Sequence, residues 1–304
     1  MTRSWGGNDQ QGLAYGLLDG GRGLLAAVLA SLGVLAFASA FPLGYDSATL
    51  TEKGAILRQV IYGYTAATAA VGVMVWFTLR GIPVETETKH DSGWATALTQ
   101  FRAVVKLKVV WLQATVLVCA YSSYKAFDQY ALFAVRGHGI DEIDAAQIVT
   151  AGAWTRPIAA LALGLLGDRF GISRMALVCF VLLIISHSLF AFTGQALGSL
   201  SMILLNTLVT GVAIFGLRGL YFGLLEEGRI PLAVTGTAVG LISVIGYTPD
   251  VYVAAIAGYL IDQNPGLLGF QHLFVLLLVF SIVGALAALA FTRQARPPSV
   301  TSAH

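Results

Sequence analysis

Charged residues are scarce in this sequence. Of its 304 residues, 11% are Asp, Glu, Lys or Arg, whereas 57% are hydrophobic. Soluble globular domains usually carry about a quarter charged residues. Residues 175–217 contain none of the four charged types, and this stretch is long enough for two passes of roughly 20 apolar residues through a bilayer. The composition therefore excludes an ordinary soluble domain and predicts an integral membrane protein.

The sequence also lacks the alternating polar and apolar strands of about ten residues that build a membrane β-barrel. Backbone polar groups in lipid must be satisfied within the spanning structure, which leaves α-helices as the spanning elements. We therefore expect an all-α membrane protein that forms a polytopic helical bundle.

Motifs of reactive or metal-binding residues are missing as well. The sequence contains no HExxH, phosphate-binding loop or G-x-S-x-G pattern, so we expect no catalytic residue, no metal site, no cofactor and no enzymatic activity. Cys119 and Cys179 stand in apolar runs without CxxC spacing, which predicts small buried hydrophobes. No basic patch with interleaved aromatic residues indicates a nucleic-acid partner.

What the sequence does contain is a series of apolar runs, each suited to one transmembrane helix. Their approximate boundaries are residues 24–41, 55–79, 109–133, 145–166, 175–192, 197–217, 233–261 and 273–291. Eight transmembrane helices are therefore predicted. If the N-terminus lies in the cytoplasm, only Lys53, Arg58 and Arg136 among the loop cations fall outside, so the bias of basic residues predicts that both termini are cytoplasmic.

Two features indicate that the spans form two groups. Residues 80–108 are long, polar and charged, unlike the other connections, and predict a linker. In addition, residues 12–22 (Gly-Leu-Ala-Tyr-Gly-Leu-Leu-Asp-Gly-Gly-Arg) and 219–229 (Gly-Leu-Tyr-Phe-Gly-Leu-Leu-Glu-Glu-Gly-Arg) resemble each other. Each is expected to end in a cytoplasmic turn before a long apolar helix, with six spans between them. Such spacing favours two halves related by an axis along the membrane normal, although two Gly/Leu-rich segments can also agree by chance.

A loop motif agrees with this organisation. Residues 164–174 read Gly-Leu-Leu-Gly-Asp-Arg-Phe-Gly-Ile-Ser-Arg and match the pattern G-x-L-x-D-R-x-G-R-[RK], except at Ile172 and Ser173. Together with the repeat and the orientation, this motif resembles the major facilitator superfamily of bacterial transporters. The resemblance implies a cytoplasmic gating motif formed by Gly164, Asp168, Arg169, Gly171 and Arg174. In it the acid caps a helix end and pairs with a nearby base.

The resemblance covers helices five to twelve of a twelve-helix fold and leaves helices one to four without a counterpart. It implies that residues 1–80 carry two helices of an N-terminal half and that residues 81–108 form a cytoplasmic linker. Residues 109–292 would then be a complete C-terminal six-helix half, and residues 293–304 a cytoplasmic tail. The implied location is a bacterial inner membrane, which the chain crosses several times.

Ionisable residues within the spans are the best candidates for function, because a charge in lipid is costly unless it faces a cavity or a partner. The helices that line the central cavity in the family carry Lys125, Arg156, Arg218 and Asp250. Together with Asp128 these are three cations and two acids. We therefore expect an anionic solute bound by Arg156, Lys125, Tyr124 and Arg218.

Asp128, Asp250 and Glu226 are the candidates for proton or charge coupling. Alternatives remain for several residues: Lys125 and Asp128 can form a structural pair, and Asp250 can be a counter-ion. Arg218 can form a gate with Glu226 or Glu227, or reach the interface.

Further expectations concern residues around these charges. Tyr121, Tyr124 and Tyr130 are expected near Lys125, lining a polar cavity or anchoring the outer interface. Gly246 and Pro249 should bend their helix. We expect a hydrogen-bonded structural role for His187.

The sequence thus predicts a secondary transporter of a small anionic organic solute that works by alternating access. Its expected partners are that solute, the lipid bilayer and a co-transported proton or cation. An accessory membrane subunit without its own transport activity is the alternative, and a polytopic membrane enzyme is less favoured.

Overall fold

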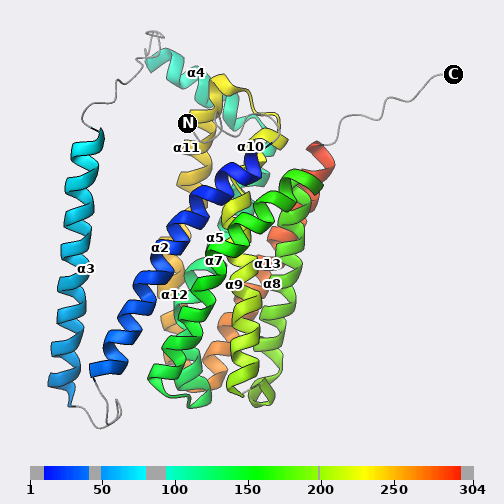
Figure 1. Cartoon of the computed structure of the whole chain (residues 1–304). Coiled ribbons are helices and arrows are strands. Elements are labelled where there is room, and N and C mark those ends of the chain that lie inside the picture. The colour runs from blue at the N-terminus through cyan, green and yellow to red at the C-terminus, as the bar shows by residue number, and fades with distance from the viewer. Residues whose placement is uncertain (1–9, 41–48, 80–93, 198, 296–304) are drawn as a thin grey trace. The chain divides into compact units, whose positions relative to one another are not determined.

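A computed structural model describes residues 10–40, 49–79, 94–197 and 199–295 of the chain (Figure 1). Within these ranges the chain is built from helices, with no β-strand. The principal helices are α2 (Gln11–Ala40), α3 (Leu50–Leu79), α4 (Trp94–Val105), α5 (Lys108–Ala126), α7 (Glu142–Phe170), α8 (Ile172–Phe192), α9 (Leu200–Leu220), α11 (Thr235–Gly246), α12 (Pro249–Gln263) and α13 (Leu267–Ala295). Short helical turns follow α5, and the four-residue helix α10 (Leu224–Glu227) follows α9. The prediction of an all-α protein is confirmed.

Seven helices in the described ranges are long and apolar enough to cross a membrane. An eighth crossing is formed if Leu98–Val105 and Lys108–Gly137, which meet at an angle of 78°, are counted as one bent span. The chain is therefore a multi-pass helical membrane protein. The seven or eight candidate spans of its described part are compatible with the eight runs read from the sequence. Of the predicted linker at 80–108, residues 80–93 lie outside the described residues, and α4 occupies most of the rest.

The chain divides into two compact units. One comprises Met1–Ala27 with Gln100–His304, and the other Val28–Thr99. In the smaller unit, the Tyr64 hydroxyl of α3 donates a hydrogen bond to the Leu29 carbonyl of α2. The first part of α2 thus belongs to the same unit as the helices from α5 to α13.

The larger unit is a helix bundle with an apolar outer surface. In α8, Val178, Val181, Ile185 and Leu189 recur at helical spacing and are exposed. The opposite face of α8 packs against α9 and α13 and is buried. An exposed apolar stripe on a helix whose other face is packed is the pattern that contact with lipid requires.

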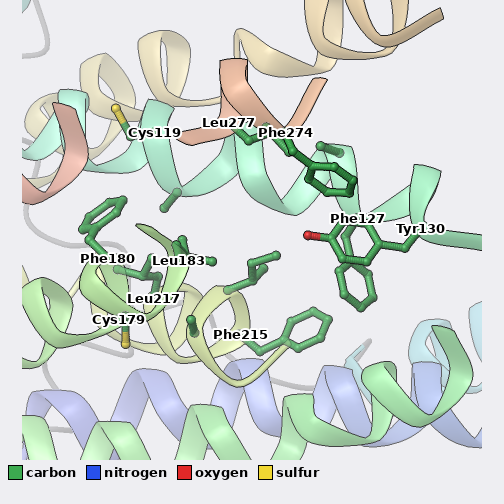
Figure 2. Close-up of a cluster of buried hydrophobic side chains, with 14 of the residues drawn as sticks. Cys119, Phe127, Tyr130, Cys179, Phe180, Leu183, Phe215, Leu217, Phe274 and Leu277 are labelled. Atoms are coloured by element: carbon green, nitrogen blue, oxygen red, sulfur yellow. The ribbon is translucent and has the colours of Figure 1, made fainter. Parts of the chain in front are cut away.

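The core of this bundle is rich in aromatic side chains (Figure 2). Phe133 packs against Phe190, Phe270 and Phe274, and Tyr130 packs against Phe127. Tyr130 is 1% exposed within this cluster, so the expectation that it lines a polar cavity or anchors an interface is wrong. Its ring contributes apolar area to the core instead.

Two smaller predictions hold in the same bundle. Cys119 and Cys179 are free and buried, as their apolar surroundings predicted (Figure 2). Buried His187 shares a hydrogen bond of 3.0 Å between Nδ1 and the Ser281 hydroxyl, which supports the structural role expected for it.

Backbone irregularities interrupt two of the spanning helices. Helix α11 ends at Gly246 and α12 begins at Pro249, as the sequence predicted. Helix α7 contains Pro157 in its interior, where the missing N–H removes one backbone hydrogen bond. At such breaks, some backbone N–H and C=O groups lack the partner that a regular helix gives them. Side chains that face the breaks therefore have these polar groups nearby.

The first segment of the sequence repeat differs from its expected structure. Residues 12–22 lie within the continuous helix α2, whereas residues 219–229 cover the end of α9, helix α10 and a turn. The expectation of a turn after residue 22 is therefore wrong. Residues 12–22 contain glycines that favour turns in isolation. In the structure, Gly12 and Gly16 instead lie on one face of the continuous helix α2.

That face packs closely on α7. A Cβ atom added to Gly12 would lie 2.1 Å from the Gly164 carbonyl oxygen, and one added to Gly16 would lie 2.6 Å from the Ala160 carbonyl oxygen. Glycines four residues apart let two helix backbones approach, as small residues commonly do in membranes. This glycine seam holds the first part of α2 against α7.

The glycine seam yields a test of stability with a matched control. Gly16→Ala should destabilise the protein by about 1–3 kcal/mol, the usual cost of overpacking. Gly21 lies on the same helix with nothing within 4 Å of an added Cβ, so Gly21→Ala should leave stability unchanged or raise it, by up to about 1 kcal/mol. Thermal unfolding of both variants in detergent, followed by tryptophan fluorescence, measures the difference. Equal effects would contradict the close packing.

Candidate functional site

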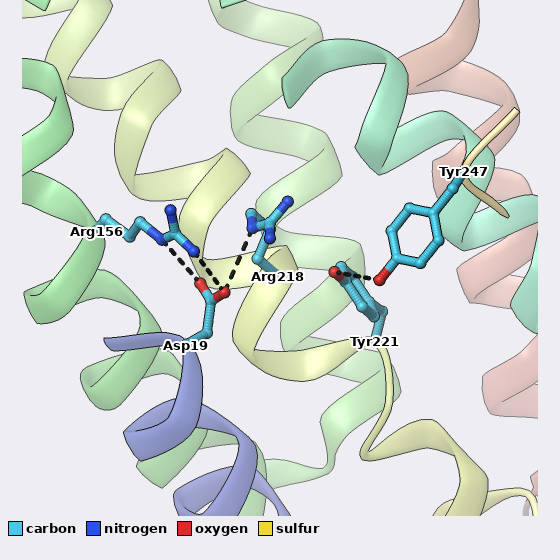
Figure 3. A network of polar contacts seen from close by, with 5 residues as sticks. All are labelled: Asp19, Arg156, Arg218, Tyr221 and Tyr247. Atoms are coloured by element: carbon cyan, nitrogen blue, oxygen red, sulfur yellow. Dashed lines mark hydrogen bonds and ion pairs between the residues drawn. The ribbon is translucent and has the colours of Figure 1, made fainter. Parts of the chain in front are cut away.

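Three charged side chains from three helices meet inside the larger unit (Figure 3). Asp19 of α2 accepts hydrogen bonds from Arg156 of α7, at 2.8 Å from Nη2 to Oδ1 and 3.2 Å from Nε to Oδ2. Nε of Arg218, from α9, lies 3.4 Å from the same Oδ1. One carboxylate is thus shared by two guanidinium groups, one of which binds it through two nitrogens.

This charge cluster, Asp19 with Arg156 and Arg218, is withdrawn from the surface. The Asp19 side chain is 9% exposed and each arginine side chain is 13% exposed. Water screens such charges poorly, so each depends on its partners much more than a surface ion pair does. Two cations around one acid leave the cluster with one net positive charge.

Aromatic rings surround the Arg218 guanidinium. Its carbon lies 4.1 Å from the centroid of the Tyr124 ring and 5.8 Å from that of Tyr121. The rings stabilise the cation through their negative faces. Nη1 of Arg218 is nonetheless buried with no hydrogen-bond acceptor among the described residues. Arg218 therefore has one donor group for which the described part of the chain offers no acceptor.

Arg156 has a less aromatic environment. Its guanidinium carbon lies 5.7 Å from the Phe215 ring centroid. Pro157 follows it directly in α7, and its stem packs where Gly23 of α2 carries no side chain. The bidentate geometry with Asp19 is the one that guanidinium groups favour with carboxylates.

Two tyrosines lie beside the charge cluster (Figure 3). The hydroxyls of Tyr221 and Tyr247 are 3.5 Å apart. Tyr221 follows the last residue of α9, and burial raises its pKa well above the ordinary value. Its hydroxyl thus remains protonated and able to donate at neutral pH.

A second group of charges comes from the end of α5, the helical turn that follows it and the start of α12. Lys125 Nζ is 3.6 Å from Asp128 and 3.4 Å from Asp250. The Tyr121 hydroxyl donates to Asp250 at 3.1 Å. The pairing of Lys125 with Asp128 was among the sequence-derived alternatives, and Asp250 is indeed a counter-ion. Because Tyr121 also faces Arg218, its side chain links the two groups of charges.

Asp19 is the residue that sequence reasoning missed. It was assigned to a turn before the first span, so it was left out of the intramembrane charges. With Asp19 included, three cations face three acids, and the expected excess of positive charge over the whole set is wrong. The signal in the sequence was the repeat itself, which aligns Asp19 with Glu226. Among the alternatives for Arg218, a gate with Glu226 or Glu227 is not what the structure shows, since its carboxylate partner is Asp19.

The predicted gating motif forms a turn and caps a helix. Asp168 accepts hydrogen bonds from the Gly12 and Leu13 amides at 2.6 and 2.8 Å, and so caps the N-terminus of α2. Gly171 has a φ of 99° and joins α7 to α8. The helix cap expected for this motif is present. The contacts of Asp168 within the described ranges are to these amides rather than to a basic side chain.

The remaining motif residues lie around that turn. Gly164 contacts the Gly12 backbone in the glycine seam. Arg169 lies 5.2 Å from the Phe170 ring centroid, and Arg174 donates to the Phe170 carbonyl. The motif therefore stabilises the α7–α8 connection locally while Asp168 holds α2.

A surface pocket of about 480 Å³ opens beside this turn. Glu227 at its wall accepts hydrogen bonds from the amide and hydroxyl of Ser173, at the start of α8. Glu226 also lines the pocket, apart from the charge cluster. Its predicted coupling role would have to be exerted at this surface rather than beside Arg156.

Comparisons with known proteins point to membrane proteins. No family model matches the chain. It is 25% identical to the inner membrane protein YihN of Escherichia coli (strain K12), over 95% of this chain and 67% of that protein. It is 24% identical to the inner membrane protein YqcE of the same organism, over 89% of this chain and 63% of that protein. The chain thus spans about two thirds of the length of these relatives. Both support an inner membrane location.

The charge cluster predicts strong coupling between its members. Asp19→Ala should destabilise the protein by about 3–5 kcal/mol, because it leaves two buried guanidinium groups without their acid. Arg156→Ala should destabilise it less, because Asp19 keeps Arg218 as a partner. The double variant should lose less than the sum, with a coupling energy of about 0.5–3 kcal/mol. Chemical or thermal unfolding of all four proteins in one detergent measures this cycle. Additive losses would show that the pair contributes no mutual stabilisation.

Proposed function

We propose that this multi-pass helical protein is a secondary transporter of a small anionic organic solute, built on the plan of the major facilitator superfamily. Alternating access of a site within the bundle would move the solute across the inner membrane. The observation that carries this proposal is the convergence of Arg156 and Arg218 from two spanning helices.

Intramembrane guanidinium groups are costly and usually serve a function. Here they come from α7 and α9, and both point to a single carboxylate position (Figure 3). The planar guanidinium fork suits carboxylate, phosphate or sulfonate groups. The unused Nη1 of Arg218 and the local net charge of the cluster favour an anion over a cation or a neutral solute.

The surrounding helices have features that alternating access requires. The glycine seam brings the backbones of α2 and α7 together, and Asp168 ties the start of α2 to the α7–α8 turn. The break between α11 and α12 lies next to Asp250, which binds Lys125. We assign the charge-coupling role to this Lys125–Asp128–Asp250 group, with a proton or cation as the coupled ion.

The orientation proposed from basic residues places the α7–α8 turn and both termini in the cytoplasm. Asp168 and the surface pocket would then lie on the cytoplasmic side. In this arrangement the helix cap on α2 acts as a latch that holds one conformation of the transporter.

A second candidate is an accessory membrane subunit without transport activity of its own. The observation that favours it is that Asp19 already binds both arginines, through Nε and Nη2 of Arg156 and Nε of Arg218. In that case the charge cluster would serve only to hold α2, α7 and α9 together. The two candidates differ in whether the purified chain moves solute.

Uptake into proteoliposomes tests the proposal. The purified 304-residue chain should accumulate at least one member of a panel of labelled carboxylates, sulfonates and organic phosphates. Arg218→Ala should reduce that uptake about tenfold or more, since hydrogen bonds to charged groups contribute about 1.5–3 kcal/mol. Arg293→Ala, which removes an exposed arginine at the end of α13, is the matched control and should transport normally.

Contrary results are distinct. Transport of neutral or cationic solutes in preference to anions would exclude the anionic class. No uptake of any panel member, by protein that unfolds cooperatively, would favour the accessory subunit.

A further inference from the structure

We infer that the carboxylate of Asp19 occupies the position that the solute's carboxylate takes during transport, so that the solute binds by displacing Asp19 from Arg156 and Arg218. This inference rests on the proposed function and deepens it: it names the solute class as carboxylates and the residue with which they compete. Asp19 is thereby a tethered competitor for the site.

The geometry of the charge cluster is that of a filled carboxylate site. Both oxygens of Asp19 accept hydrogen bonds from Arg156, and Oδ1 also faces Nε of Arg218. The donors come from α7 and α9, which pack on each other, whereas the acceptor comes from α2. A free carboxylate can present the same two oxygens to the same donors without help from α2.

The cluster also has more donors than Asp19 uses. Nη1 of Arg218 is buried and without an acceptor in the described part of the chain. Asp19 is fixed to its helix and cannot turn to reach every donor of both arginines at once. A free carboxylate has no such restriction, and an acceptor for a buried charged donor relieves an unfavourable desolvation. Displacement of Asp19 can therefore be favourable even though it breaks an ion pair.

The local structure of α2 permits this displacement. Gly20 and Gly21 follow Asp19 directly, and two adjacent glycines weaken a helix. Nothing lies within 4 Å of a Cβ added to Gly21, so the helix is open on that side. Solute binding would thus free the middle of α2, while Asp168 holds its start. Binding of the solute would thereby be coupled to movement of α2.

Chemical rescue tests the inference on the full chain in detergent. Asp19→Ala should lower the unfolding temperature, and sodium acetate should restore part of that loss by occupying the vacated position. Sodium chloride at the same ionic strength should restore less. In the wild-type protein Asp19 competes with acetate for the site, so the preference for acetate over chloride should be much smaller than in Asp19→Ala.

Two further variants make the test specific. Asp250→Ala removes a carboxylate that binds Lys125 and should show no preference for acetate over chloride. Asp19→Ala combined with Arg218→Gln should lose the rescue, because one of the two guanidinium groups is gone. If Asp19→Ala does not yield folded protein, Asp19→Ser also vacates the carboxylate position and should show the same preference for acetate.

The outcomes separate this inference from the proposed function. Acetate that fails to stabilise either Asp19 variant, or that stabilises wild type and variant alike, overturns the inference, even if uptake is observed. Rescue that requires Asp19 to be absent and Arg218 to be present supports it. Rescue without uptake of any panel anion would support the carboxylate site while contradicting transport.

Discussion

The bundle depends on one constraint, the presence of two buried guanidinium groups that must share an acid. Arg156 and Arg218 belong to neighbouring spans, and each is 13% exposed. Their mutual repulsion would be unfavourable in this environment without Asp19. Asp19 belongs to α2, which is far from both arginines in the sequence, so the charge cluster ties α2 to α7 and α9. The position of α2 therefore follows from electrostatics as well as from packing.

Close packing of α2 on α7 allows α2 to take that position. Asp19 can reach Arg156 only because the glycine seam brings the α2 backbone against α7, with Gly16 facing Ala160 and Gly23 facing the stem of Arg156. Asp168 adds a cap at the start of the same helix. Small residues, a helix cap and an ion pair thus act on one segment of about four turns. These three kinds of contact together hold the start of α2 against α7.

Much of the architecture was predictable, because lipid imposes simple requirements on sequence. The spans, the buried cysteines, the break between Gly246 and Pro249 and the hydrogen-bonded His187 all follow from local patterns. The pairing of Lys125 with Asp128 is local too, since the residues are three apart. Asp19, by contrast, is 137 residues from Arg156 and 199 from Arg218, and its glycine-rich surroundings favour a turn when considered alone. Tyr130 was misplaced for a related reason: it is near charged residues in the sequence, but its ring packs on Phe190 and Phe274 from distant helices.

The sequence by itself determined that this chain is a helical membrane protein and which types of residue are available to its spans. Hydrophobicity and helix length are sums over neighbouring residues, so no knowledge of the fold is needed to evaluate them. Only the tertiary structure decided which charges face each other. That choice depends on helix rotation and on the distance between backbones, which the glycines of α2 and the small residues of α7 set jointly. It made Asp19 the partner of both arginines. The cationic side chains that the sequence left unpaired therefore already bind a carboxylate of the chain itself.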